Sequence, residues 1–312
     1  MPPLEPLKPP PLEPGAPIAL LSPSGPAPAA ALDAAVARIE GRGHPVRLGR
    51  NAAARRHYLA GDDDQRAEDL HAAFADPAIQ AIFCSRGGYG SSRLLDRLDM
   101  ELIRQHPKIV VGFSDTTALH LGLWARTGLV GLTGCLAAYD LDRTDPFTAD
   151  ALWHALEAAA PHTADELDPA VQVLRSGQTR GRLLGGCLSL VVHLLGTPYQ
   201  PDFTGALLLL EDVGEAPYRV DRMLCQLRLA GVLDRIGGLI LGQFKDCAGD
   251  DDAPTIAEIA LEHLGQRPIP VIEGFPYGHF PRRLVLPLGL EYELDTAPPR
   301  LRCCEGAFAQ IL

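Results

Sequence analysis

The sequence has little excess positive charge, few aromatic side chains and no long apolar segment. Its 312 residues include 28 Lys and Arg against 39 Asp and Glu, a formal net charge of −11. This balance argues against a general surface for nucleic acid or anionic lipid. No uninterrupted apolar run approaches the roughly 18 residues that a membrane helix needs, because even the run 206–210 stops at Glu211. We therefore expect no nucleic-acid partner and no membrane segment.

Paired cysteines and metal-binding motifs are also missing. The seven cysteines are scattered without C-x-x-C spacing, and their odd number argues against a disulfide framework or a structural zinc site. The sequence contains no H-E-x-x-H motif, and its glycine-rich stretch does not match the dinucleotide-binding pattern G-x-G-x-x-G. We expect neither a metal nor a cofactor.

The N-terminal segment lacks the basic and apolar regions of a secretory signal. The first 17 residues contain eight prolines instead. This composition predicts an extended, disordered tail over residues 1–16 and a protein that stays in the cytoplasm.

Apolar segments of strand length alternate with helical patterns after this tail. Expected strands lie within 17–21, 78–84, 108–113 and 129–134, and expected helices within 31–43, 62–77, 91–103 and 114–127. Such alternation predicts a parallel sheet covered by helices on both faces. We assign residues 17–138 to this N-terminal domain.

A second domain is expected over residues 179–312. Residues 139–178 change to an Asp-, Thr-, Pro- and Ala-rich composition, with one helical segment around 149–160, and are interpreted as an interdomain connection. The second domain holds apolar strands at 205–211, 237–244 and 269–273, a helix at 218–231, and a β-rich segment through 284–294.

The stretch IVVGFSDTTALH, residues 109–120, ends a strand directly before Ser114 and Asp115 and opens a helix at once. It resembles the elbow that presents a nucleophile, with Thr116 at the position of the last glycine in G-x-S-x-G. Ser114 Oγ would project beyond the sheet, and the N–H of Asp115 would face an oxyanion. The common alternative is that Ser114 or Asp115 only caps the helix.

A glycine turn follows the preceding strand in SRGGYGSSRLL. Gly87 and Gly88 would let a substrate approach backbone N–H groups closely, which suits a second oxyanion donor. A tight turn without such a role is the alternative. Arg86, beside these glycines, is a candidate cation for a substrate carboxylate.

A carboxylate and a histidine could complete the site. Glu211 ends a buried strand, where open α/β sheets bind their ligands, although a solvated loop charge is the alternative. His279 lies in a turn after the strand 269–273, and a structural role is its alternative. A nucleophilic serine needs an imidazole base, and the imidazole needs a carboxylate, so Ser114, His279 and Glu211 supply the three roles.

These stretches together resemble the murein LD-carboxypeptidase family of serine peptidases. The resemblance covers the chain from residue 18 onward and runs in order through LLSPSGP, SRGGYGSSRLLDRLD, VVGFSDTTALH, LLGGCLSLVVHLLGTPY, LLLLEDVGEAPYRVDRMLCQL and GFPYGH. The nucleophile of the family motif G-[FYH]-S-D falls on Ser114. The glutamate that opens the E-D pair falls on Glu211, and the histidine that closes G-x-x-x-G-H falls on His279.

The resemblance implies an α/β fold with an N-terminal Rossmann-like or flavodoxin-like parallel-sheet domain, a C-terminal α/β domain and the active site between them. It also implies a cytoplasmic homodimer. The implied substrate is a muropeptide: the enzyme would cut an L-to-D amide bond and release the terminal D-alanine of murein tetrapeptides during cell-wall recycling. Whether lysine or diaminopimelate is preferred at the third peptide position stays open.

Two other functions remain as alternatives. The microcin C self-immunity proteins of the same family cleave an aminoacyl-adenylate analogue, but the compact segment GTPYQPDFTG, which has no inserted aromatic loop, favours the carboxypeptidase. The more distant alternative is a non-catalytic α/β protein that binds a nucleotide on the glycine turn. Cys187 stands where relatives usually have Asn in G-G-N-L, which questions any side-chain hydrogen bond from this position.

Overall fold

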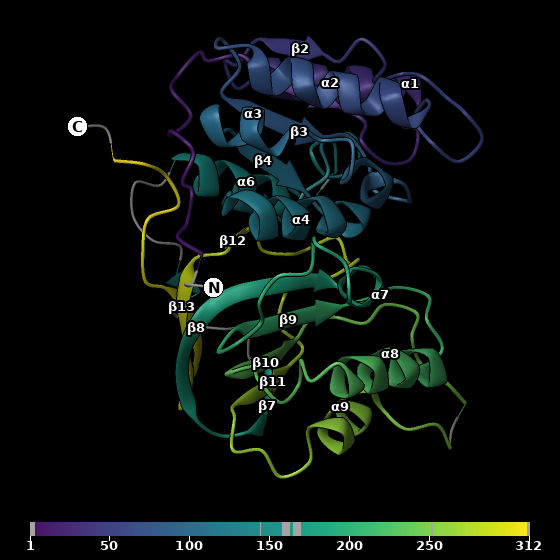
Figure 1. Cartoon of the computed structure of the whole chain (residues 1–312), viewed down its shortest axis with the longest axis vertical. Coiled ribbons are helices and arrows are strands. Elements are labelled where there is room, and N and C mark those ends of the chain that lie inside the picture. Colours follow the sequence, from purple (N-terminus) through teal and green to yellow (C-terminus); the bar gives the residue numbers. More distant parts are fainter. Residues whose placement is uncertain (1–3, 144, 158–162, 165–169, 251, 311–312) are drawn as a thin grey trace.

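The computed structural model describes residues 4–143, 145–157, 163–164, 170–250 and 252–310, and two parts, each built on its own sheet, are stacked on one another (Figure 1). The first part contains β1 (Ile18–Leu21), α1 (Ala29–Glu40), β2 (Val46–Leu48), α2 (Asp63–Ala75), β3 (Ala81–Cys84), the 3-10 helix η1 (Ser91–Leu94), α3 (Met100–Gln105), β4 (Ile109–Gly112), the 3-10 helix η2 (Ser114–Thr116), α4 (Thr117–Thr127), β5 (Gly131–Thr133), α5 (Ala137–Asp140) and α6 (Phe147–Glu157). The second contains β6 (Thr163–Ala164), β7 (Gln172–Arg175), β8 (Gln178–Cys187), α7 (Leu188–His193), β9 (Leu207–Glu211), α8 (Pro217–Leu229), β10 (Gly238–Leu241), α9 (Ile256–Leu264), β11 (Val271–Glu273), β12 (Leu286–Leu288), β13 (Glu291–Thr296) and β14 (Pro299–Cys303).

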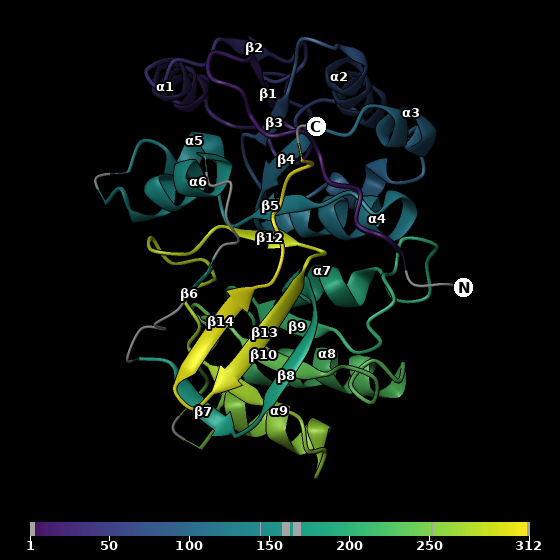
Figure 2. The same ribbon diagram turned by 90° about the vertical axis from the view of Figure 1, so that its left-hand side faces the viewer.

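The first sheet has the strand order β12-β5-β4-β3-β1-β2, and β1 to β5 are parallel. Its central strands are fully buried because α1, α5 and α6 cover one face while α2, α3 and α4 cover the other (Figure 2). This is the expected helix-covered parallel sheet. The carboxyl ends of β3 and β4 meet at one edge, where ligands of such sheets bind.

The second sheet has the order β6-β14-β13-β8-β9-β10-β11-β7. The long strand β8 joins its two halves: residues 178–182 pair antiparallel with β13, and residues 183–187 pair parallel with β9. Strands β9, β10 and β11 are parallel neighbours, so their carboxyl ends also share one edge. This edge carries Glu211.

The two parts are joined by a strand and by a side-chain contact. Strand β12 comes from the C-terminal half but pairs antiparallel with β5 of the first sheet. Tyr277 Oη lies 2.6 Å from Thr133 Oγ1, and both side chains are buried. These links hold the edge of the first sheet against the turn that carries His279.

Three local predictions need correction. Residues 4–16 are ordered rather than disordered: Leu7 forms a β-bridge with Leu129, and Lys8 forms an ion pair with Glu305. Proline excludes a helix or a sheet ladder here, but it does not prevent an extended chain from packing.

The single helix expected over 91–103 is divided into η1 and α3. Asp99 begins the second helix by accepting hydrogen bonds from the N–H groups of Glu101 and Leu102. An aspartate favours this N-cap position over a helix interior. The expected connection 139–178 contains α6, as predicted, but it also contains β7, which pairs with β11 of the second sheet. The expected boundary at Thr179 therefore falls within the strands of that sheet.

Candidate active site

Ser114 occupies a sharp turn between β4 and α4. It opens the 3-10 helix η2 with a φ of +63°, in the left-handed region that non-glycine residues avoid. Such a conformation costs roughly 1 kcal/mol or more and persists only where its surroundings enforce it. Phe113 before it is extended and buried. The expected strand-turn-helix elbow is thus present, at the carboxyl end of a central strand.

A continuous chain of hydrogen bonds joins Ser114, His279 and Glu211 across the two sheets. The Nε2 atom of His279 lies 2.9 Å from Ser114 Oγ, and its Nδ1 atom lies 2.7 Å from Glu211 Oε2. The imidazole ring packs against Phe113, with ring centroids 4.8 Å apart. This geometry lets His279 hold the serine proton on one side while the carboxylate fixes its other nitrogen.

Glu211 is completely buried at the end of β9. Burial raises the pKa of its carboxyl group, and the hydrogen bond and charge of His279 oppose that rise. Its second oxygen, Oε1, has no hydrogen-bond partner among the described residues. The interaction with His279 is therefore the main compensation for burying this carboxylate.

The glycine turn after β3 lies directly against the elbow. A Cβ atom added to Gly87 would lie 3.1 Å from Ser114 Oγ and 3.3 Å from the backbone nitrogen of Asp115. The backbone N–H groups of Gly87 and Asp115 have no backbone acceptor among the described residues. Two free donors beside a serine hydroxyl are what an oxyanion hole requires.

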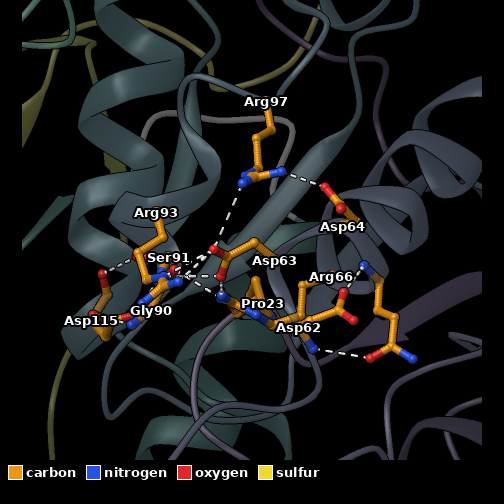
Figure 3. A network of polar contacts seen from close by, with 11 residues as sticks. Pro23, Asp62, Asp63, Asp64, Arg66, Gly90, Ser91, Arg93, Arg97 and Asp115 are labelled. Carbon is orange, nitrogen blue, oxygen red and sulfur yellow. Dashed lines mark hydrogen bonds and ion pairs between the residues drawn. The ribbon is translucent and has the colours of Figure 1, made fainter. Parts of the chain in front are cut away.

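The side chain of Asp115 holds the elbow and the glycine turn together (Figure 3). Its carboxylate accepts hydrogen bonds from the backbone nitrogens of Gly90, at 3.3 Å, and Ser91, at 2.8 Å. Ser91 Oγ donates to the carbonyl of Asp115 at 2.6 Å. The carboxylate of Asp115 therefore has a structural role, while its N–H stays available to a substrate.

A buried arginine supports the same turn from behind. Arg66, on α2, donates to the carbonyl of Gly90 at 2.8 Å and to that of Pro23, and forms an ion pair with Asp63 (Figure 3). Asp63 in turn pairs with Arg93 of η1. This network fixes the backbone that faces Ser114.

A cavity of about 170 Å³ opens in front of Ser114 and His279. Three arginines contribute to its walls: Arg86, Arg143 and Arg283. Arg86 donates to the carbonyl of Pro26 at 2.7 Å, and its guanidinium lies 5.6 Å from the ring centre of Tyr139. Five of the residues expected at the site from sequence therefore line this small space: Arg86, Gly87, Gly88, Ser114 and His279. Glu211 and Asp115 do not line it, but Glu211 contacts it through the hydrogen bond to His279.

Arg283 is a component of the site that the sequence analysis missed. It is buried, and its guanidinium lies 4.2 Å from the ring centre of Phe113. It donates to the carbonyls of Gly134 and Phe280 and pairs with the buried Asp140. The only local signal is its position four residues after His279. Arg283 fixes the chain on both sides of the histidine turn.

Asp140 and Arg143 were also missed. Asp140 accepts a hydrogen bond from the backbone nitrogen of Leu136 at 2.7 Å, and its other oxygen lies 3.1 Å from Arg143 Nε. Both residues line the cavity. They lie in the segment that the sequence suggested to be a connection, where no motif marks them.

Cys187 lies opposite Glu211 in the pairing of β8 with β9. Its backbone nitrogen donates to Thr117 Oγ1 at 3.2 Å, and its thiol lies 3.4 Å from Asp212 Oδ1. Burial raises the pKa of this thiol well above its usual value. The cysteine is therefore a neutral group beside the buried carboxylates.

No group of three His, Cys, Asp or Glu side chains that could hold a metal ion is found in the described part of the chain. Within the same residues, no helix has the length and apolar character to cross a bilayer.

Comparison with known proteins matches both halves of the chain to models of one family. The family model of the LD-carboxypeptidase N-terminal domain matches residues 18–134, and that of the LD-carboxypeptidase C-terminal domain matches residues 180–294. A Streptomyces coelicolor protein named as a carboxypeptidase is 41% identical, over 91% of this chain and 92% of its own. The murein tetrapeptide carboxypeptidase of Pseudomonas aeruginosa is 33% identical, over 87% and 91%.

Solved structures agree over nearly the whole chain. MccF, a microcin C7 self-immunity protein, in complex with glutamyl sulfamoyl guanosine superposes with a TM-score of 0.90 at 26% identity, covering 97% of this chain and 100% of that chain. The muramoyltetrapeptide carboxypeptidase from Oxalobacter formigenes gives 0.80 at 29% identity, covering 91% and 97%.

The fold and the family models define a two-domain α/β peptidase. The chain belongs to the LD-carboxypeptidase family, as its sequence motifs indicated.

Proposed function

We propose that this protein is a serine carboxypeptidase that releases the terminal D-alanine of murein tetrapeptides by hydrolysing an L-to-D amide bond. The observation that carries the proposal is the hydrogen-bonded chain Ser114, His279 and Glu211, which opens on a small cavity lined by arginines. The names of the Pseudomonas aeruginosa and Oxalobacter formigenes relatives support the substrate.

His279 Nε2 accepts the proton of Ser114 as Oγ attacks the carbonyl carbon of the scissile bond. Glu211 keeps the imidazole in the required tautomer and stabilises the imidazolium that forms. The N–H groups of Asp115 and of the Gly87-Gly88 turn stabilise the oxyanion. His279 then gives its proton to the departing amino group of D-alanine, and water, activated by the same histidine, hydrolyses the acyl-enzyme.

The arginines of the cavity give the exopeptidase its specificity for a chain end. The carboxylate of the terminal residue would bind Arg86, as the sequence suggested, or Arg143, whose two side-chain hydrogen bonds both use Nε. The cavity volume of about 170 Å³ suits a small terminal residue such as D-alanine.

A second candidate substrate is a peptidyl or aminoacyl nucleotide. It is favoured by the TM-score of 0.90 to MccF, against 0.80 to the muramoyltetrapeptide carboxypeptidase. The compact segment 196–205 and the small cavity favour the tetrapeptide. A non-catalytic nucleotide-binding function has no such support, since the chain belongs to a peptidase family.

The test is a direct competition between these substrates. Purified enzyme is incubated with a murein tetrapeptide ending in D-alanine, with its L-alanine stereoisomer and with an aminoacyl sulfamoyl adenosine, and products are followed by mass spectrometry. The proposal expects release of the terminal alanine from the D-alanine peptide and no hydrolysis of the other two substrates. Hydrolysis of the nucleotide analogue without D-alanine release would replace it by the second candidate.

We further propose that the enzyme acts in the cytoplasm as a homodimer, which is supported by its resemblance to the family. Light scattering on a gel-filtration column should give twice the mass of the chain. Recovery of the enzyme in the periplasmic or secreted fraction of the native cells would contradict the cytoplasmic site of action.

A further inference from the structure

A second and larger cavity, of about 530 Å³, lies next to the catalytic cavity. Phe280 is part of its wall, while the preceding residue, His279, lines the catalytic cavity. Gly242, also in its wall, packs against Glu211: a Cβ atom on this glycine would lie 3.2 Å from Glu211 Cβ. The two cavities thus lie on either side of the turn at residues 279 and 280, and the second also lies close to Glu211.

Two polar side chains of this second cavity, those of Gln243 and Glu273, come from the same sheet edge that carries Glu211. Glu211 ends β9, Gln243 follows β10, and Glu273 ends β11. The three strands are parallel neighbours in this order. Adjacent strands lie about 4.8 Å apart, so the backbone of Glu273 is roughly 10 Å from that of Glu211.

Glu273 and Gln243 each present an acceptor oxygen to which no described residue donates a hydrogen bond. The carboxylate of Glu273 is half-buried and forms no hydrogen bond or ion pair with any described residue. Burial raises the pKa of this carboxyl group. Gln243 Oε1 is fully buried and also lacks a donor in the described part of the chain. A buried acceptor with no partner destabilises the protein, and a ligand that supplies a donor would remove that cost.

The rest of the wall combines apolar side chains with the polar side chains of Gln172, Asp250 and Thr255, and its described residues carry no positive charge. Phe244, Ile256 and Phe280 supply apolar surface, and none of the described residues that line the cavity is Lys, Arg or His. This is the opposite of the catalytic cavity with its three arginines. An aliphatic chain ending in an ammonium group matches both the apolar wall and the two acceptors.

We propose that this cavity binds the aliphatic ammonium group of the substrate, with Glu273 and Gln243 as its acceptors. The inference rests on the proposed carboxypeptidase function and identifies the source of that group as a lysine side chain at the third position of the peptide. The side chain of diaminopimelate also ends in a carboxylate, for which the described wall offers no cation. The carboxylate of the leaving residue binds among the arginines, and the ammonium group binds in the neighbouring cavity. The enzyme then selects its substrate by binding a carboxylate in one cavity and an ammonium group in the other.

The test compares two tetrapeptides that differ only at the third position, one with lysine and one with norleucine. For the lysine peptide, Glu273→Gln should raise KM about tenfold or more with kcat little changed, because a hydrogen bond to a charged group is lost. For the norleucine peptide, the substitution should have no effect. Gln243→Leu, which keeps the backbone hydrogen bond from residue 243 to Tyr277, should act in the same direction. Glu262→Gln, which removes the same charge from an exposed position on α9, is the matched control and should change neither peptide.

An equal effect of Glu273→Gln on both peptides, or no effect on either, would overturn the proposal while leaving D-alanine release intact. Binding of n-hexylamine, followed by calorimetry with n-hexanol as the control, tests the cavity without hydrolysis. Glu273-dependent binding of the amine together with no D-alanine release would support the ammonium site and overturn the carboxypeptidase proposal. Absence of amine binding to the wild-type protein would count against the site itself.

Discussion

Gly87 packs so closely against Ser114 that a methyl group at Gly87 would lie 2.9 Å from Ser114 Cβ and 3.1 Å from Ser114 Oγ. The residue comes from the turn after β3, whereas Ser114 follows β4, so two adjacent strands of one sheet deliver the free N–H groups to the same point. The space between them is the place where a substrate carbonyl oxygen would bind.

Gly87→Ala is therefore expected to reduce kcat/KM on the order of 100-fold or more, because the methyl group would clash with Ser114 and displace the turn or the nucleophile beside it. Gly87 does not adopt a positive φ, so its backbone accepts alanine. Gly41→Ala, in an ordinary helical conformation far from the site with a contact of 3.1 Å to Ala37 O, is the control. A Gly87→Ala enzyme with normal turnover would show that this turn does not hold the oxyanion.

The strained backbone of Ser114 predicts that a substitution which removes both the strain and the hydroxyl abolishes activity but increases stability. Ser114→Gly should abolish peptide hydrolysis and raise the free energy of unfolding by about 1 kcal/mol relative to Ser114→Ala, since glycine accepts a φ of +63° without strain. Glycine also gains entropy in the unfolded chain, which works against this rise. Urea unfolding of the two variants measures the difference, and a less stable glycine variant would mean that the turn stores little strain.

Arg283 and Asp140 form a buried pair that supports the histidine turn. Arg283→Met should cost about 3–5 kcal/mol of stability, because it leaves the Asp140 carboxylate without its buried partner. The double variant Arg283→Met/Asp140→Asn should recover part of this loss in urea unfolding. If the two single effects simply add, the residues do not act as a pair.

His120 predicts an acid-sensitive fold. Burial on α4 lowers the pKa of its imidazole to about 4, whereas an unfolded chain has the ordinary value of about 6.5. Because the unfolded state binds the proton more tightly, the stabilisation is fully present above pH 6.5 and is lost as the pH falls toward 4.

Between pH 7 and pH 5 this histidine alone should remove about 2 kcal/mol from the free energy of unfolding. His120→Asn should flatten the pH dependence by that amount in urea unfolding at the two pH values. An unchanged slope in the variant would assign the acid sensitivity to other groups.

The candidate site could be predicted from the sequence most fully where it depends on local geometry. The elbow of Ser114 could be predicted because a strand, a turn and a helix follow one another within twelve residues. His279 and Glu211 were found because each follows an apolar strand and matches a motif of the family. Their mutual hydrogen bond, across 68 residues of chain, needed the structure.

What the sequence could not indicate depends on distant partners. Arg283 gains its role from Asp140 and Gly134, which lie 143 and 149 residues away in the chain and belong to the other part of the molecule. Residues 4–16 were expected to be disordered because their composition excludes helices and strands, yet their contacts come from Leu129, Glu305 and Ala309. The unpaired acceptors Gln243 and Glu273 carry no motif at all.

The central claim is that the hydroxyl of Ser114, activated by His279 and Glu211, attacks the peptide. The most direct test measures D-alanine release from a murein tetrapeptide by the wild-type enzyme and by Ser114→Ala, with circular dichroism to establish that both are folded. The account predicts release by the wild-type protein and a loss of at least about 1,000-fold in kcat for the variant. Release at an undiminished rate by the folded alanine variant would contradict it.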